Sequence, residues 1–488
     1  MEPSPGTAAP AAGSGDAQVQ AVSDDGRRIR QAVVVIHGIG EQRPMDTLRG
    51  FVDAVLTDVS GYDTKYRSKP DAMGDLLETR RLQAPASRQE GRPQTDFYEY
   101  YWAHHMEGSK YSQVFRWMLW LLFRRPSSVV SALRPAWFAS WGLLVFAIVL
   151  LVAGSWVDAT SGSHLFDWLG KWIFAGGVLT FILQSIASYV VLGYVADAAR
   201  YLTPNPGNIE ARNKIRSEGI KLVRSLHESG KYSRIVIVGH SLGSVIGFDI
   251  IRNLWSDLRQ PGTPHPQKQP ELKAFEQEAA KLDAGPPTRA AIESFQQAQH
   301  RLWSEFRAIG VPWLVTDFVT LGSPLTHAQF LMADNEEDFK RRKVQHEYPC
   351  CPPAGNDTLG YETRYRIQQG AETIVRSVRV AHHGAPFCCT RWTNLYFPYR
   401  RWIFGDLIGG PINGVLGTGV RDVAVVPSTG KRLDGTLLSH VRYWTDGNAA
   451  QSAASGSDGT PSLKALRSAL RLEFLRGKSA RANSGTAP

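Results

Sequence analysis

A serine flanked by two glycines is the feature of this chain that most directly suggests covalent catalysis. Residues 239–243 read Gly-His-Ser-Leu-Gly, and a Gly-x-Ser-x-Gly pattern places a serine hydroxyl on a sharp turn from a strand into a helix. The glycines permit the tight backbone, and the N-terminus of the helix favours the negative charge that develops when the hydroxyl attacks a carbonyl group. We therefore take Ser241 as a candidate nucleophile.

The elements needed to position Ser241 are indicated on both sides of it. Residues 233–238 form an apolar, β-branched run typical of a buried strand, and residues 244–254 have the composition of a helix. Near the N-terminus, the apolar run 31–36 leads through a His-Gly-Ile-Gly turn into helical spacing over residues 45–59. Strands that alternate with helices favour an α/β fold with a mostly parallel central sheet flanked by helices.

These motifs resemble those of the α/β-hydrolase superfamily, and within it the lipase-like serine esterases, which pair an N-terminal His-Gly-x-Gly turn with Gly-His-Ser-Leu-Gly. The resemblance covers about residues 31–59 and 208–444, apart from insertions. It extends to residues 392–394, Trp-Thr-Asn, and to residues 440–444, His-Val-Arg-Tyr-Trp, which match the family's Trp-x-Asn and His-x-x-Tyr-Trp patterns. The resemblance implies an α/β-hydrolase fold and a Ser-His-Asp triad.

The resemblance also implies a chain order of nucleophile, acid and base. It assigns Ser241 as nucleophile and His440, the last histidine of the chain, as base. For the acid it offers Asp406, which follows a strand-like segment, with Asp422 as the alternative. Leu407 stands where the family commonly has proline. In this arrangement the serine attacks the carbonyl carbon, the histidine takes its proton and later protonates the leaving group, and the carboxylate holds the imidazole tautomer.

An oxyanion hole is implied as well. In such enzymes the donors are backbone N–H groups of the residue after the nucleophile and of the first glycine turn, which here are Leu242 and Ile39. His37, in the same turn, is expected to brace the backbone rather than to transfer protons. Ser323 lies in a Gly-Ser-Pro sequence after a strand-like run, and we expect a structural role for it.

Two long uncharged segments predict insertion into a membrane. Residues 135–157 and 172–196 hold no charged residue over 23 and 25 positions, and about 20 apolar residues suffice to cross a hydrocarbon core of about 30 Å. Five cations and no acid lie between residues 110 and 134, so the positive-inside rule puts both flanking regions in the cytoplasm. We expect a transmembrane hairpin in an integral membrane protein, such as one of a bacterial inner membrane. The alternative is a buried hairpin in a soluble enzyme.

Two further regions show helical spacing. Residues 260–310 contain two runs that fit a helical lid over the serine or, equally, an insertion packed against the edge of the sheet. Residues 463–476 carry leucines on one side with Lys and Arg among them, which is typical of a helix on anionic lipid.

The composition and the spacing of the cysteines and glycines argue against a nucleic-acid partner, a metal site and a nucleotide cofactor. The chain has 488 residues, of which 43% are hydrophobic, so it can bury a large core. Its net charge of +10 is concentrated before the uncharged segments, so we expect no nucleic-acid partner. The adjacent pairs Cys350-Cys351 and Cys388-Cys389 suit neither a disulfide framework nor a structural zinc site with His382 and His383. Neither glycine-rich turn has the spacing of a phosphate-binding or dinucleotide-binding motif, and we expect no metal and no cofactor.

The sequence therefore predicts a membrane-integrated serine hydrolase, esterase-like or lipase-like, that cleaves a carboxyl ester of a lipid or another hydrophobic substrate. A thioesterase or amidase with the same triad, and a non-catalytic membrane-anchored scaffold, are the alternatives, and the oligomeric state is left open. The expected division of the chain is a disordered tail over 1–30, a first hydrolase part over 31–107, an interfacial helix with the transmembrane hairpin over 108–200, a second hydrolase part over 201–444, and a linker with a basic amphipathic helix over 445–488.

Overall fold

The computed structural model describes most of the chain outside its termini and outside a long segment before residue 201. The described residues are 29–38, 43–56, 64–71, 79–87, 90–106, ten isolated positions between 138 and 153, 201, 206–283, 285, 287–333, 335–353, 359–369, 372–399, 405–406, 408–426, 437–444 and 461–473.

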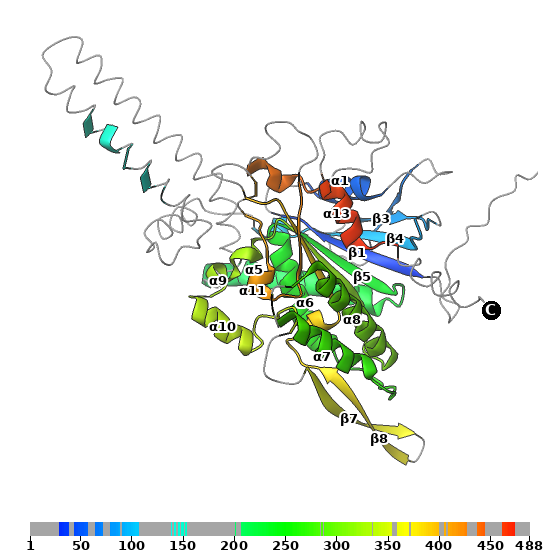
Figure 1. Cartoon of the computed structure of the whole chain (residues 1–488). Coiled ribbons are helices and arrows are strands. Elements are labelled where there is room, and N and C mark those ends of the chain that lie inside the picture. Colours follow the sequence, from blue (N-terminus) through cyan, green and yellow to red (C-terminus); the bar gives the residue numbers. More distant parts are fainter. Residues whose placement is uncertain are drawn as a thin grey trace, which may run out of the picture.

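An eight-stranded sheet runs through the centre of the molecule in the order β10-β9-β6-β5-β1-β4-β3-β2 (Figure 1). Its strands are β1 (Arg30–Ile36), β2 (Arg67–Pro70), β3 (Arg80–Ala84), β4 (Gln94–Tyr100), β5 (Arg234–His240), β6 (Val315–Leu321), β9 (Arg391–Tyr396) and β10 (Arg421–Ala424). The six strands from β10 to β4 are parallel, whereas β3 and β2 pair antiparallel. The carboxyl ends of β5, β6 and β9 therefore share one edge, which is where α/β sheets place their ligand sites.

Helices cover both faces of the sheet, because its central strands are apolar on both sides. Val33 and Val35 of β1 pack in one core with α1 (Asp46–Val55) and α13 (Pro461–Leu470). Val34 and Ile36 point the other way, into a larger core with α5 (Pro206–Glu228), α6 (Leu242–Leu258) and α8 (Arg289–Ala308). The chain is thus an α/β fold with a mostly parallel mixed sheet and helices on each face.

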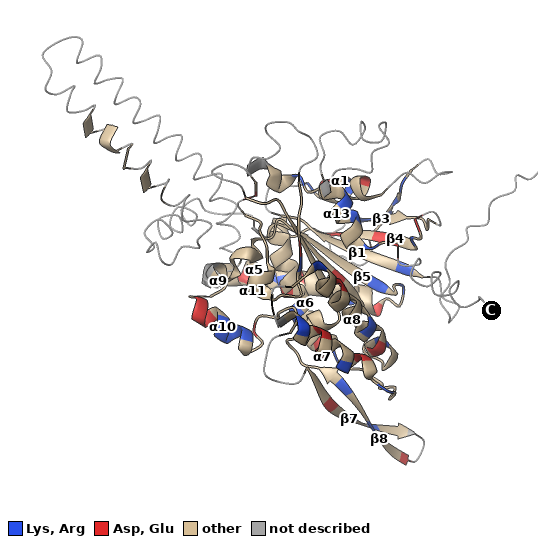
Figure 2. Ribbon diagram, in the orientation of Figure 1, with Lys and Arg blue, Asp and Glu red and all other residues tan. Residues whose placement is uncertain are grey.

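The remaining elements lie around the sheet and the helices that cover it. They are the helices α7 (Pro270–Asp283), α9 (Ala328–Leu331), α10 (Glu336–Val344) and α11 (Asn413–Leu416), the 3-10 turns η1 (Ala103–Met106), η3 (Pro324–His327), η4 (Pro386–Cys388) and η5 (Leu437–Val441), and the strands β7 (Gly360–Gln369) and β8 (Glu372–Ala381). The strands β7 and β8 pair only with each other and form a hairpin that projects from the body (Figure 1). Acidic residues begin α10 and basic residues end it (Figure 2), which complements the helix dipole.

The transmembrane hairpin of the predicted fold class is corrected by the structure. Among the described residues, no helix is both long enough and apolar enough to cross a bilayer. The predicted spans 135–157 and 172–196 lie outside the described residues, except for a few positions of the first span. A run without charges has the length of a span, but it does not by itself specify a membrane helix. The fold is therefore described as an eight-stranded α/β fold without that hairpin.

The helices expected over residues 260–310 form α7 and α8, but they do not form a lid over Ser241. Gln296 of α8 donates a hydrogen bond to the carbonyl oxygen of Trp392, and Gln299 donates to those of Phe387 and Thr390. These carbonyls lie at the beginning of β9, whereas Ser241 follows the end of the parallel strand β5. The insertion therefore packs at the end of the sheet opposite to Ser241, which is the second of the two expected arrangements.

The C-terminal helix α13 is also placed differently from the expectation of a lipid-bound helix. Leu466 and Leu470 are completely buried in the core beside α1. The guanidinium of Arg467 donates hydrogen bonds to the carbonyl oxygens of Ala54 and Val55, at the C-terminus of α1. The apolar side of α13 is buried against α1, and Arg467 binds the end of α1. The helix is therefore part of the protein core.

Candidate active site

Ser241 occupies a strained turn between β5 and α6. Its backbone has φ 52° and ψ −126°, a conformation that non-glycine residues rarely adopt. The N–H of Ser241 donates to the carbonyl oxygen of Leu321 at the end of β6 (2.9 Å), and its own carbonyl accepts from the N–H of Ser244 (3.0 Å), which starts the helix. Strain of this kind persists where surrounding contacts enforce it, most often at functional sites.

Three glycines make this turn sterically possible. A Cβ atom on Gly239 would lie 2.4 Å from the Cα of Ser244, and one on Gly243 would lie 2.2 Å from the carbonyl oxygen of Ile36. A Cβ on Gly38 would lie 2.8 Å from the Cβ of Ser241. The first glycine turn and the serine turn therefore approach each other more closely than side chains would allow.

Asp406 and His440 form a buried pair near the ends of the neighbouring strands. The Nδ1 atom of His440 lies 2.8 Å from Oδ2 of Asp406. The same oxygen accepts a hydrogen bond from the hydroxyl of Tyr443 (2.8 Å), and Oδ1 accepts from the N–H groups of Ile408 and Gly409 (2.9 Å each). Burial alone would raise the pKa of Asp406, but His440 and these donors outweigh it and lower the pKa to about 2. The carboxylate is thus ionised at neutral pH.

Ser241 and His440 are brought to the same place by the chain around β6. Gly322 directly follows Leu321, whose carbonyl binds the Ser241 N–H, and a Cβ on Gly322 would lie 2.8 Å from Oδ2 of Asp406 and 3.0 Å from Cε1 of His440. His240, next to the serine, donates from Nε2 to the carbonyl oxygen of His440 (2.9 Å). Burial and the nearby His440 lower the pKa of His240 to about 3, so this donor is a neutral imidazole.

Asp422, the alternative acid, has a different set of partners. Its carboxylate accepts hydrogen bonds from the backbone N–H groups of Ile412 and Asn413 and from the side-chain amide of Asn394. Burial raises its pKa despite these donors. The carboxylate that binds His440 is that of Asp406, and Asp422 holds the loop before α11.

Comparison with protein-family models, with curated proteins and with solved structures gave no match. The positions of the side chains and the motifs they occupy are thus the basis for the chemistry of the site.

The two predicted oxyanion donors differ in what the structure describes. Leu242 is the first residue of α6, and the first N–H groups of a helix have no intrahelical acceptor. This N–H is adjacent to Ser241 and can bind an oxygen atom beside the serine. Ile39 lies outside the described residues.

His37 and Ser323 have the surroundings of structural residues. The ring of His37 stacks on Trp102 with centroids 5.2 Å apart, and Trp102 donates its indole N–H to the carbonyl oxygen of His37. Burial lowers the pKa of His37 to about 4. The Ser323 hydroxyl lies 2.6 Å from that of Ser244 and accepts from the N–H of Leu325, so it begins the turn η3.

Two groups of side chains among the described residues have metal-ligating chemistry that the sequence did not indicate. One consists of His346, His382 and His383, and the other of His104, His105 and Glu218. His346 and Glu218 are distant in sequence from their partners, so no spacing motif could have found them. The four cysteines are buried free thiols, and burial raises the pKa values of Cys350, Cys351 and Cys389, which opposes thiolate ligation.

Proposed function

We propose that this protein is a serine hydrolase that cleaves a carboxyl ester with Ser241 as nucleophile, His440 as general base and acid, and Asp406 as the residue that orients the base. The observation that carries the proposal is the buried hydrogen bond between His440 Nδ1 and Asp406 Oδ2 beside the strained turn of Ser241. Nucleophile, base and orienting acid are the three roles that acyl transfer by a serine requires.

The proposed reaction proceeds through an acyl-enzyme. The Ser241 oxygen attacks the ester carbonyl carbon while Nε2 of His440 takes the hydroxyl proton. Asp406 keeps the proton of Nδ1 in place and stabilises the imidazolium that forms. When the tetrahedral intermediate collapses, the bond to the leaving alkoxide breaks and His440 gives it the proton. A water molecule then attacks the acyl-serine in the same way, which releases the acid and restores the serine.

The oxyanion of each tetrahedral intermediate needs donors that are already in position. We assign this role to the N–H of Leu242 and, as an extension of the sequence pattern, to that of Ile39. Both are backbone groups. The contribution of Leu242 also benefits from the position of its N–H at the start of the α6 helix dipole.

A hydrophobic ester, such as a lipid ester, is the substrate class that we propose. The support comes from the motifs shared with lipase-like esterases. The same chemistry would cleave thioesters and amides. Rates of hydrolysis of an ester, a thioester and an amide therefore have to be compared to find the preferred substrate. The cytoplasmic membrane location stays a prediction from the sequence.

Labelling with a fluorophosphonate probe tests the proposal, because this reagent reacts with activated serines. We expect the wild-type chain to be labelled and the Ser241→Ala variant to remain unlabelled. Ser323→Ala is the matched control, since it removes a buried hydroxyl close to the same strand ends, and it should keep the label. Hydrolysis of p-nitrophenyl esters of increasing acyl length, compared with a thioester and an anilide, then ranks the substrate classes.

Two results would refute a serine hydrolase that uses Ser241 as its nucleophile. One is a wild-type protein that is folded by circular dichroism but takes up no label. The other is labelling that survives in Ser241→Ala and is lost in Ser323→Ala. The first result would support the non-catalytic scaffold.

A further inference from the structure

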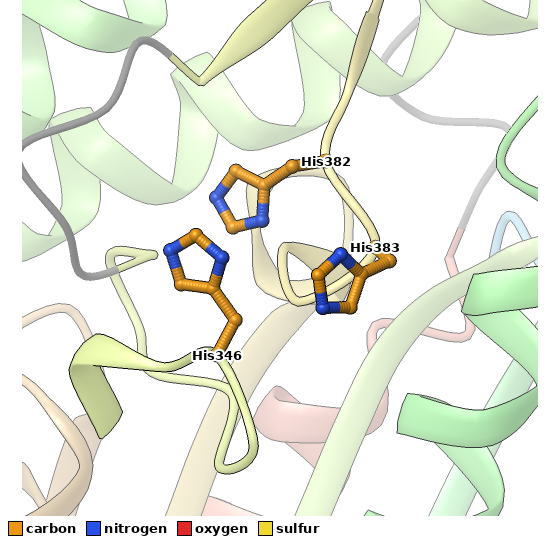
Figure 3. A group of neighbouring side chains, drawn as sticks. All are labelled: His346, His382 and His383. Carbon is orange, nitrogen blue, oxygen red and sulfur yellow. The ribbon is translucent and has the colours of Figure 1, made fainter. Parts of the chain in front are cut away.

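Three histidine rings from two separate segments of the chain lie close together (Figure 3). His346 comes from the turn after α10, whereas His382 and His383 follow the last residue of β8. The rings of His346 and His382 are 4.0 Å apart and nearly parallel, and that of His383 lies 5.7 Å from His346. One ring nitrogen of each histidine lies within 4.8 Å of one ring nitrogen of each of the others.

The backbone holds these rings together by contacts that tolerate little change. His346 has φ 60°, a conformation that is uncommon for a residue with a side chain, although histidine is among those enriched in it. A Cβ on Gly384 would lie 2.6 Å from the Cβ of His346, so only glycine allows the two segments to approach so closely. Trp255 of α6 donates its indole N–H to the carbonyl oxygen of His382 (3.0 Å).

The ring nitrogens of the cluster have the chemistry that ligation needs. Neutral imidazole is the form of histidine that binds metal ions. The Nε2 atom of His346 is shielded from solvent and has no hydrogen-bond partner among the described residues. A shielded nitrogen of this kind is stabilised by a ligand.

We propose that His346, His382 and His383 form a binding site for a divalent transition-metal ion, with zinc as the best fit and water completing the coordination. Three nitrogen donors and no carboxylate match zinc rather than calcium or magnesium, which take oxygen ligands. With Zn–N bonds of about 2.1 Å, ligand nitrogens of a tetrahedral site lie about 3.4 Å apart. The rings therefore draw together on binding, and those of His346 and His382 tilt out of their parallel arrangement so that both point at one ion.

One hydrogen bond in the cluster depends on which nitrogen of His382 binds the ion. The N–H of Gly384 donates to Nδ1 of His382 at 3.2 Å, which is at the long end for such a bond. If His382 ligates through Nδ1, this N–H loses its acceptor, whereas ligation through Nε2 leaves the hydrogen bond in place. Metal binding therefore breaks at most one long hydrogen bond and forms three bonds between nitrogen and the ion.

The ion in this site would lie far from Ser241. Ser241 precedes α6, and Trp255 lies near the other end of that helix. At 1.5 Å per residue, the two are about 20 Å apart. The site would fasten the segment after α10 and the base of the β7–β8 hairpin to each other and, through Trp255, to α6. Its occupancy is thus independent of the proposed hydrolase activity.

Titration of the full chain with zinc tests the site. The protein is first stripped with a chelator, and binding is then measured by calorimetry and by thermal unfolding. We expect binding of one Zn²⁺ per chain and a rise in Tm on binding. His383→Ala and His346→Ala should each weaken the affinity by at least about tenfold, because losing a ligand costs more than losing one of its supporting groups. His383 is the exposed member, so its replacement is expected to preserve the fold.

Two control variants make the result specific. His265→Ala removes an exposed histidine outside the cluster and should bind zinc as the wild type does. His105→Ala disrupts the second group of candidate ligands, in which the His105 ring lies 2.7 Å from a Glu218 carboxylate oxygen, and it should also bind normally. The proposal is overturned if the wild type binds no zinc, or if binding survives in His346→Ala and His383→Ala and is lost in His105→Ala.

Discussion

Two buried aspartates have pKa values shifted in opposite directions, and their hydrogen-bond partners distinguish them. Asp406 faces a histidine and a tyrosine hydroxyl and has its pKa lowered to about 2. Asp422 faces two backbone amides and an asparagine, and burial raises its pKa. A carboxylate that orients a catalytic base has to be ionised and has to touch that base, and Asp406 meets both conditions.

Replacement of these aspartates by asparagine should therefore separate activity from stability. We expect Asp406→Asn to lower kcat for ester hydrolysis by on the order of 10⁴-fold, because an amide at this position favours the wrong imidazole tautomer. Asp422→Asn should leave kcat close to that of the wild type and reduce the free energy of unfolding by about 1–3 kcal/mol. Steady-state kinetics and urea unfolding of both variants measure the two effects. The reverse pattern would make Asp422 the acid.

At the scale of the elements, the turn from β5 into α6 depends on the absence of side chains at its glycines. The space next to Gly243 is filled by the carbonyl groups of Ile36 and His37 at the end of β1. Backbone atoms cannot rotate away as the end of a flexible side chain can. The contact also brings the first glycine turn against the serine turn, so one steric requirement shapes both halves of the proposed oxyanion site.

A methyl group at Gly243 should consequently disrupt both the fold and the activity. We expect Gly243→Ala to reduce the free energy of unfolding by at least about 3 kcal/mol, at the upper end of overpacking effects, and to abolish labelling of Ser241. Gly262→Ala is the control, because nothing lies within 4 Å of the added atom, and its stability should stay within about 0.5 kcal/mol of the wild type. Urea denaturation measures both variants, and equal stability of the two would contradict the steric argument.

Local elements could be predicted from the sequence because their signals are local. The apolar runs that became β1 and β5, and the helix after Ser241, lie within a few residues of the motif that they support. The two helices of the 260–310 insertion were also recognisable, but amphipathic spacing does not say which end of the sheet a helix covers. For the same reason the leucines of α13 were attributed to a lipid surface when they pack on α1.

The rest of the site depends on tertiary contacts that no spacing reveals. The choice between Asp406 and Asp422 required the position of His440, and the three-histidine cluster required the approach of the α10 and β8 segments. The uncharged runs over 135–157 and 172–196 misled the fold prediction, since lack of charge is a property of composition and does not establish how a segment is placed.

At the scale of the whole molecule, one buried carboxylate ties the sheet to the C-terminal segment. Asp317 of β6 accepts hydrogen bonds from Arg391 of β9, from Arg234 of β5 and from Arg471, which follows α13. Arg234 also donates to the carbonyl oxygens of Leu470 and Arg471. Three guanidinium groups around one carboxylate hold their positions only while that carboxylate is charged.

Neutralising this carboxylate should destabilise the protein in a pH-dependent way. Burial would raise the pKa of Asp317, but Arg391, Arg234 and Arg471 outweigh it and lower the pKa well below the ordinary value of 3.8. The ionised form therefore stabilises the fold fully above that value, and this contribution is lost as the pH falls toward the lowered pKa. We expect Asp317→Asn to cost about 3–5 kcal/mol at pH 7.

Chemical denaturation of wild type and Asp317→Asn from pH 7 down to pH 2 checks the sign of this effect. The difference in stability should be constant near neutrality and shrink below a pH of 3.8. A difference that grows on acidification would show that the arginines do not depend on the charge of Asp317.

The order of the strands determines when the candidate site can assemble during synthesis. The imidazole of His240 binds the carbonyl oxygen of a residue 200 positions later, and the strand β1 pairs with β5 across a similar distance. A ribosome releases the serine turn long before it has made the strands and the histidine that complete the site, and domains fold as units once their chain is available. The nascent chain thus carries the proposed nucleophile without its proposed base until residue 440 is translated, so the proposed activity requires the chain up to that point.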